Sequence, residues 1–94
     1  MLFRSDEDRK RVKPYDGFLA YFPKAIACVA ALSSKGNEQH GIGDGKTPEW
    51  DRAKSPDELN SLTRHLMEGH WDAVAWRAMA NLEKQLEKGW RPGQ

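Results

Sequence analysis

The chain has 94 residues, which is enough for one small domain. Its 15 basic and 14 acidic side chains leave a net charge of +1, so we expect no direct binding to nucleic acid or to an anionic membrane surface. No apolar run approaches the roughly 18 residues of a membrane span, and the first residues lack the apolar core of a signal peptide. The single cysteine, Cys28, excludes an intrachain disulfide, and we expect it to be a small buried side chain in a reducing, cytoplasmic location.

Residues 1–16 form a charged segment in which Asp6, Glu7 and Asp8 are followed at once by three basic residues. Mixed charge without apolar periodicity predicts a solvated, partly flexible N-terminal arm. We expect a single domain over residues 17–89 and a short C-terminal tail over residues 90–94.

A first long helix is expected to begin at Phe22-Pro23, because a proline at the first helical position gives up no helical hydrogen bond. The helical spacing continues to about His40, which places Glu38 in the last turn or just beyond it. Three glycines and a proline between residues 41 and 48 exclude a regular element there. The apolar side of this helix is expected to contain Ile26, Val29, Ala30 and Ser33.

A second helix has the clearest start signal, with Ser55 as N-cap, Pro56 at the first position and Glu58 completing a capping box. Gly69 is expected to end it. Leucines at helical spacing predict its buried stripe, and polar residues occupy a different face. The stripe contains Leu59, Leu62 and Leu66; the polar face contains Asp57, Ser61, Arg64, His65 and Glu68.

A third helix is expected to begin near Asp72, whose carboxylate suits a cap or a first turn, and to end at Gly89. No segment shows the alternation of a strand, so the predicted class is all-α, a small helical domain of three main helices. A domain this small buries little apolar surface, and we expect oligomerisation to complete it as a dimer or tetramer. The predicted inner side of the third helix contains Val74, Ala75, Ala78, Met79, Leu82 and Leu86.

Three polar clusters fall at the end of the first helix, in the loop after it and on the second helix. They contain an acid, two imidazoles, two cations and an indole, which is a set suited to holding a polar ligand. The residues are Glu38, His40, Trp50, Lys54, Arg64 and His65.

Several runs of sequence, taken together, resemble phage proteins of the dATP/dGTP diphosphohydrolase type, which are small relatives of the MazG-like all-α nucleoside triphosphate pyrophosphohydrolases. The resemblance covers about residues 9–88. The runs are YFPKA at residues 21–25, GNEQH at 36–40, WDRAKS at 50–55, RHL at 64–66 and VAWRA at 74–78.

The resemblance implies an oligomeric, MazG-like enzyme that cleaves purine deoxynucleoside triphosphates to a monophosphate and pyrophosphate. It implies Mg²⁺ or Mn²⁺, which take oxygen ligands and bridge phosphate oxygens. We expect Glu38 to bind this ion, with Glu68 and Asp72 completing the site.

The remaining roles implied for the site concern the substrate. We expect Arg64 and Lys54 to contact phosphates, His40 to contribute to substrate binding, and Trp50 to stack on the base. Glu38 and His65 are the expected catalytic residues, with His65 orienting water or holding the loop. In the simpler alternative Arg64 pairs with Glu68 one helical turn away, and Trp50 packs on the core.

Two other functions stay open from the sequence. The chain lacks the paired E-x-x-E and E-x-x-D sets of active MazG-like enzymes, so the same scaffold could bind a nucleotide without cleaving it, for example to block a host defence protein. The tryptophan-rich composition also suits a module that binds another protein through its surface.

Overall fold

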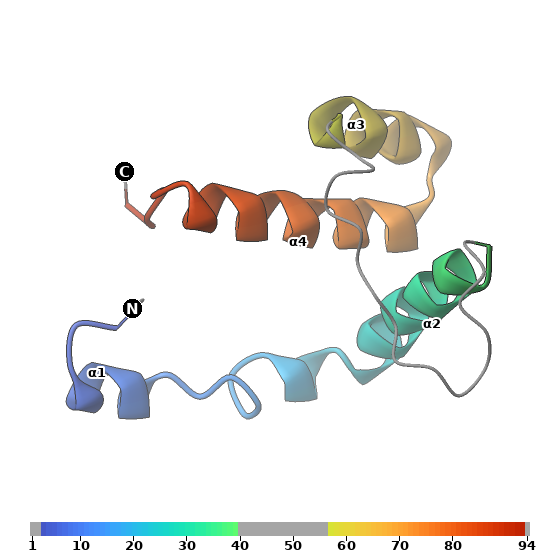
Figure 1. Ribbon diagram of the computed structural model, residues 1–94. Helices are drawn as coiled ribbons and strands as arrows, with labels where there is room; N and C mark the ends of the chain where they lie inside the picture. Colours follow the sequence, from blue (N-terminus) through green and yellow to red (C-terminus); the bar gives the residue numbers. More distant parts are fainter. Residues whose placement is uncertain (1–2, 40–56, 94) are drawn as a thin grey trace.

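The computed structural model describes residues 3–39 and 57–93, and at residues 36–39 it describes the backbone only (Figure 1). The described residues form helices and contain no strand, which confirms the all-α class. Three helices are long, as predicted. The elements are α1 (Asp6–Arg11), η1 (Leu19–Tyr21), α2 (Pro23–Gln39), α3 (Glu58–Glu68) and α4 (Trp71–Glu87).

The ends of the long helices agree closely with the sequence. Helix α2 begins at Pro23 and continues to Gln39. Helix α3 ends at Gly69, whose φ of 73° lies in the left-handed region that favours glycine. Helix α4 ends before Gly89. Local signals that need no tertiary partner therefore located these boundaries.

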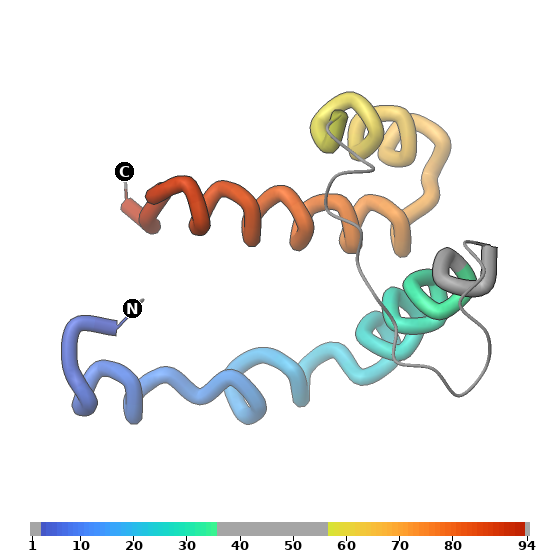
Figure 2. The backbone as a smooth tube through the Cα atoms, viewed as in Figure 1, coloured from blue at the N-terminus to red at the C-terminus, as the bar shows by residue number. Residues whose placement is uncertain are grey.

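The N-terminal arm contains a short helix that the sequence reading did not predict. The Ser5 side chain caps α1 by accepting a hydrogen bond from the Asp8 N–H at 3.1 Å. The helix has no buried residue, and within the described chain it packs against no other element. Figure 2 shows α1 and η1 in a row that leads into α2. The arm is thus locally structured and solvated.

Helix α4 is the centre of the domain. It packs against α3 on one side and α2 on the other, and η1 contacts α2 (Figure 1). The buried apolar residues of the described chain, Ala73 and Ala80, both lie on α4. These small side chains let neighbouring helices approach closely, but they form a very small core. No helix in the described ranges is long and apolar enough to cross a membrane.

The predicted apolar faces of α3 and α4 are covered only in part, with Leu62, Val74 and Leu86 half-buried. Leu59 and Leu66 of the predicted α3 stripe are 67% and 47% exposed, while Glu58 and Ser61 are the buried residues of this helix. On α4 the predicted inner residues Met79 and Leu82 are exposed. Both helices are therefore rotated relative to the arrangement that hydrophobicity alone predicts.

An ion-pair network explains this rotation. The Glu58 side chain is 6% exposed, and its two carboxylate oxygens lie 3.5 Å from Arg77 Nη1 and 3.0 Å from Lys84 Nζ, both on α4. A buried carboxylate needs such partners, because loss of hydration is otherwise very costly. The capping-box role predicted for Glu58 is wrong, since the side chain faces α4; Ser55 and Pro56 lie outside the described residues.

The domain is more open than a compact chain of its length. Its radius of gyration is 15.4 Å, against about 13 Å for a compact domain of roughly 100 residues. Cys28 is exposed, so the prediction that it is buried is wrong. Among residues 23–35 of α2, Val29, Leu32 and Ser33 are half-buried, and Cys28 lies outside this face.

Removing the buried carboxylate should destabilise the fold. We expect Glu58→Ala to lower the free energy of unfolding by about 3 kcal/mol, because it leaves two cations on α4 without their shared partner. Urea denaturation followed by circular dichroism measures the change. The exposed Glu83 on α4 supplies the control, and Glu83→Ala should change the free energy of unfolding by no more than about 0.5 kcal/mol. Equal effects for the two variants would show that the network does not hold α3 on α4.

Candidate functional site

The described part of the predicted site lies at the corner between α3 and α4, where Gly69 and His70 connect the two helices. Glu68 is the last residue of α3, and α4 begins at Trp71, so Gly69 and His70 make the whole connection. The Gly69 N–H donates to Leu66 O at 3.2 Å, and the His70 N–H donates to His65 O at 2.9 Å. These hydrogen bonds end α3 and hold the backbone of His70 against the last turn of that helix.

Three side chains gather at this corner. His65 Nδ1 lies 3.2 Å from His70 Nδ1, and His70 Nδ1 lies 3.3 Å from Glu68 Oε2. The two imidazole rings are 5.4 Å apart between centroids and tilted by 49°. His65 is half-buried, whereas Glu68 and His70 are exposed. The corner thus presents two nitrogen donors and one carboxylate to solvent.

Arg64 lies on the last turns of α3 and reaches toward the start of the same helix. Its Nη2 is 3.7 Å from Asp57 Oδ2, and both side chains are more than half exposed. An exposed ion pair of this length contributes at most about 1 kcal/mol, so the guanidinium can exchange Asp57 for another anion at little cost. The structure pairs Glu68 with His70.

Two of the three residues predicted to bind Mg²⁺ or Mn²⁺, Glu68 and Asp72, have described side chains. Asp72 lies in the first turn of α4, as expected, and its Oδ1 accepts a hydrogen bond from the Ala73 N–H at 2.8 Å. Glu68 forms a group with the imidazoles of His65 and His70, and Asp72 does not belong to this group. Magnesium takes oxygen donors at octahedral positions, and this mixed donor set does not fit it.

The other predicted site residues divide into two groups. Glu38 lies in the last turn of α2, as the sequence predicted, and its side chain is outside the described part of the structure. His40, Trp50 and Lys54 also lie outside the described residues. The gathering of all six polar residues around one ligand therefore stays a prediction.

Sequence reasoning missed the part that His70 plays at the corner. His65 and His70 are five positions apart, a spacing that does not place two residues on one face of a continuous helix. The signal was the intervening Gly69, because a left-handed residue after a helix reverses the chain. A histidine before and another after such a glycine can meet across the helix end.

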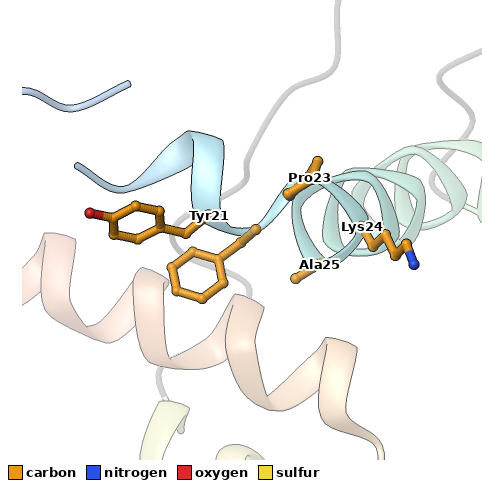
Figure 3. A pocket seen from close by; sticks show the side chains of 5 residues that line it. Tyr21, Pro23, Lys24 and Ala25 are labelled. Carbon is orange, nitrogen blue, oxygen red and sulfur yellow. The ribbon is translucent and has the colours of Figure 1, made fainter. Parts of the chain in front are cut away.

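A separate hollow of about 370 Å³ lies at the junction of η1 and α2. Figure 3 shows Tyr21 and Lys24 extending in different directions from this junction. One continuous stretch of chain, residues 21–25, lines the hollow, and it includes none of the predicted site residues. The Tyr21 and Phe22 rings contact edge to face at 5.9 Å between centroids. We interpret this hollow as a surface feature of the aromatic junction.

Comparison with known proteins adds no relative to this description. The chain matches no family model, no curated protein and no solved structure.

The left-handed glycine at the corner gives a direct test of this geometry. We expect Gly69→Ala to lower the free energy of unfolding by about 1 kcal/mol, because a side chain is strained at a φ of 73°. Thermal unfolding followed by circular dichroism measures the loss. An added Cβ meets no atom within 4 Å, so the substitution causes no steric clash and tests the backbone strain alone. An unchanged melting temperature would contradict the assigned backbone conformation.

Proposed function

We propose that the protein is a nucleotide pyrophosphohydrolase of the phage dATP/dGTP diphosphohydrolase type. The observation that carries the proposal is the joint occurrence of GNEQH, WDRAKS and RHL, in this order, in an all-α chain. Each run alone is weak, and their combination is specific. The solvent-exposed Arg64 supports the proposal, because its guanidinium is accessible to a phosphate.

In the proposed reaction, water attacks the α-phosphorus of a purine deoxynucleoside triphosphate. The bond from this phosphorus to the bridging oxygen breaks, the nucleoside monophosphate keeps the α-phosphate, and pyrophosphate leaves. Arg64 and Lys54 would neutralise charge on the phosphate oxygens, and Trp50 would stack on the purine. His65 would orient the attacking water or hold the loop, and Glu38 would bind the divalent ion. His40 would contribute a further contact to the substrate.

Release of pyrophosphate tests this proposal. Incubation with each deoxynucleoside triphosphate, in buffer with Mg²⁺ or Mn²⁺, should yield monophosphate and pyrophosphate from the purine nucleotides first. Arg64→Ala should lower kcat/KM at least tenfold through loss of phosphate contacts. Arg9→Ala, which removes an exposed arginine from the N-terminal arm, should leave kcat/KM unchanged. Absence of pyrophosphate with every nucleotide at high protein concentration would refute the proposal.

One structural observation favours a second candidate, a nucleotide-binding protein without turnover. Among the described residues, the one group of candidate metal ligands is His65, Glu68 and His70, which contains a single carboxylate. Arg64 and its neighbours can still hold phosphate without a cluster of carboxylates. Calorimetry separates the two candidates: binding of a nucleotide that persists in EDTA, without pyrophosphate release, supports the second.

We also propose that the functional unit is a homo-oligomer. The chain exposes 7819 Å², whereas a compact monomer of this size exposes about 5,500 Å². This excess is larger than the roughly 600–1,000 Å² that each partner buries in a standard interface, so a second copy can cover part of it. The outward-facing leucines of α3, together with Met79 on α4, supply apolar surface for such an interface.

Self-association makes a direct prediction. Light scattering after size exclusion should give the mass of a dimer or tetramer. Leu59→Glu should shift the population toward monomer, because it puts a charge on the exposed apolar face of α3. Asn60→Glu, one position along the same helix and outside the leucine stripe, is the control and should leave the mass unchanged. A monomeric mass for the unaltered protein at high concentration would contradict the proposal.

A further inference from the structure

We propose that His65, Glu68 and His70 form a binding site for a divalent transition metal of the zinc type. This site shares His65 with the proposed reaction, but it requires no nucleotide. It rests on three side chains within six positions of the sequence, all at the corner between α3 and α4.

The distances at the corner suit a single ion. One potential ligand atom from each residue lies within 4.8 Å of the other two. The separations that His70 Nδ1 makes with His65 Nδ1 and Glu68 Oε2 are 3.2 and 3.3 Å. Zinc–ligand bonds of about 2.0–2.1 Å place two ligands of a tetrahedral ion about 3.3 Å apart. Both separations match the edge of a zinc tetrahedron.

The chemistry of the donors selects the class of metal. Two imidazole nitrogens and one carboxylate are a ligand set that zinc uses in proteins, and imidazole also suits copper and nickel. Magnesium and calcium prefer oxygen donors, so they should compete poorly. The corner should therefore bind zinc in the presence of the Mg²⁺ that the proposed hydrolysis would use.

The backbone holds the donors in place before any metal binds. Gly69 provides the left-handed turn. The hydrogen bond from the His70 N–H to His65 O at 2.9 Å holds the backbones of the two histidines together. Little rearrangement is then needed, which lowers the entropic cost of binding. Since Glu68 and His70 are exposed, a fourth position is open to water.

A metal at this corner would clamp the end of α3 to the start of α4. The described core is small, so a ligand that binds only the folded chain should raise its stability measurably. Zinc should therefore increase the melting temperature, and the increase should disappear with the ligands.

Titration with zinc chloride alone tests the site. Calorimetry should show one ion per chain for the unaltered protein, and zinc should raise the melting temperature in circular dichroism. His65→Ala and His70→Ala should each weaken zinc binding at least tenfold and abolish the thermal shift. Glu68→Gln should weaken binding to a smaller extent, since the amide oxygen is a poorer ligand than a carboxylate.

A matched variant separates this site from adventitious binding. The exposed Glu83 on α4 provides the control, and Glu83→Gln should leave zinc affinity unchanged. Melting in EDTA shows whether each variant folds. Absence of zinc binding by the unaltered protein, or equal losses with Glu83→Gln and His70→Ala, would overturn the proposal, whatever the outcome with nucleotides.

Discussion

The buried carboxylate of Glu58 between Arg77 and Lys84 determines how α3 sits on α4. A carboxylate that is 6% exposed needs compensating charge close by, and both cations are on α4. Once the first residue of α3 faces α4, helical geometry places positions three, four and seven residues later on the same side. Ser61 is buried and Leu62 and His65 are half-buried for this reason.

The same rotation exposes two of the three stripe leucines of α3 to solvent. Leu59 and Leu66 would form a conventional inner stripe in a helix packed by hydrophobicity alone, yet both are exposed. The described chain therefore combines a polar internal contact with apolar outer surface. That distribution is unfavourable for an isolated monomer and suits one in which a second copy covers the outer face. The ion pair and the proposed self-association are two consequences of one helix orientation.

The chain reversal at Gly69 brings potential metal ligands from both sides of the α3–α4 corner together. Because His65 follows Glu58 by two helical turns, it lies on the half-buried side of α3, and the reversal at Gly69 brings His70 to meet it. Arg64, one position earlier, faces solvent beside Asp57. A cation accessible to phosphate and a pair of imidazoles suited to a metal thus occur within one short stretch. His65 is the residue that the two proposed binding functions share.

The sequence by itself determined the class of the fold and most helix ends. Pro23, Gly69 and Gly89 act on the backbone within a few residues, so their effects can be predicted without knowing what packs nearby. Glu38 and Asp72 were likewise located correctly along their helices, at the last turn of α2 and the first turn of α4. Only the tertiary structure decided which faces are buried and which polar groups meet. Periodicity identifies an apolar stripe, but a buried ion pair between helices can outweigh it, as Glu58 does. The meeting of His65 with His70 depended on the chain reversal at Gly69, which places a residue after α3 beside one of its last turn.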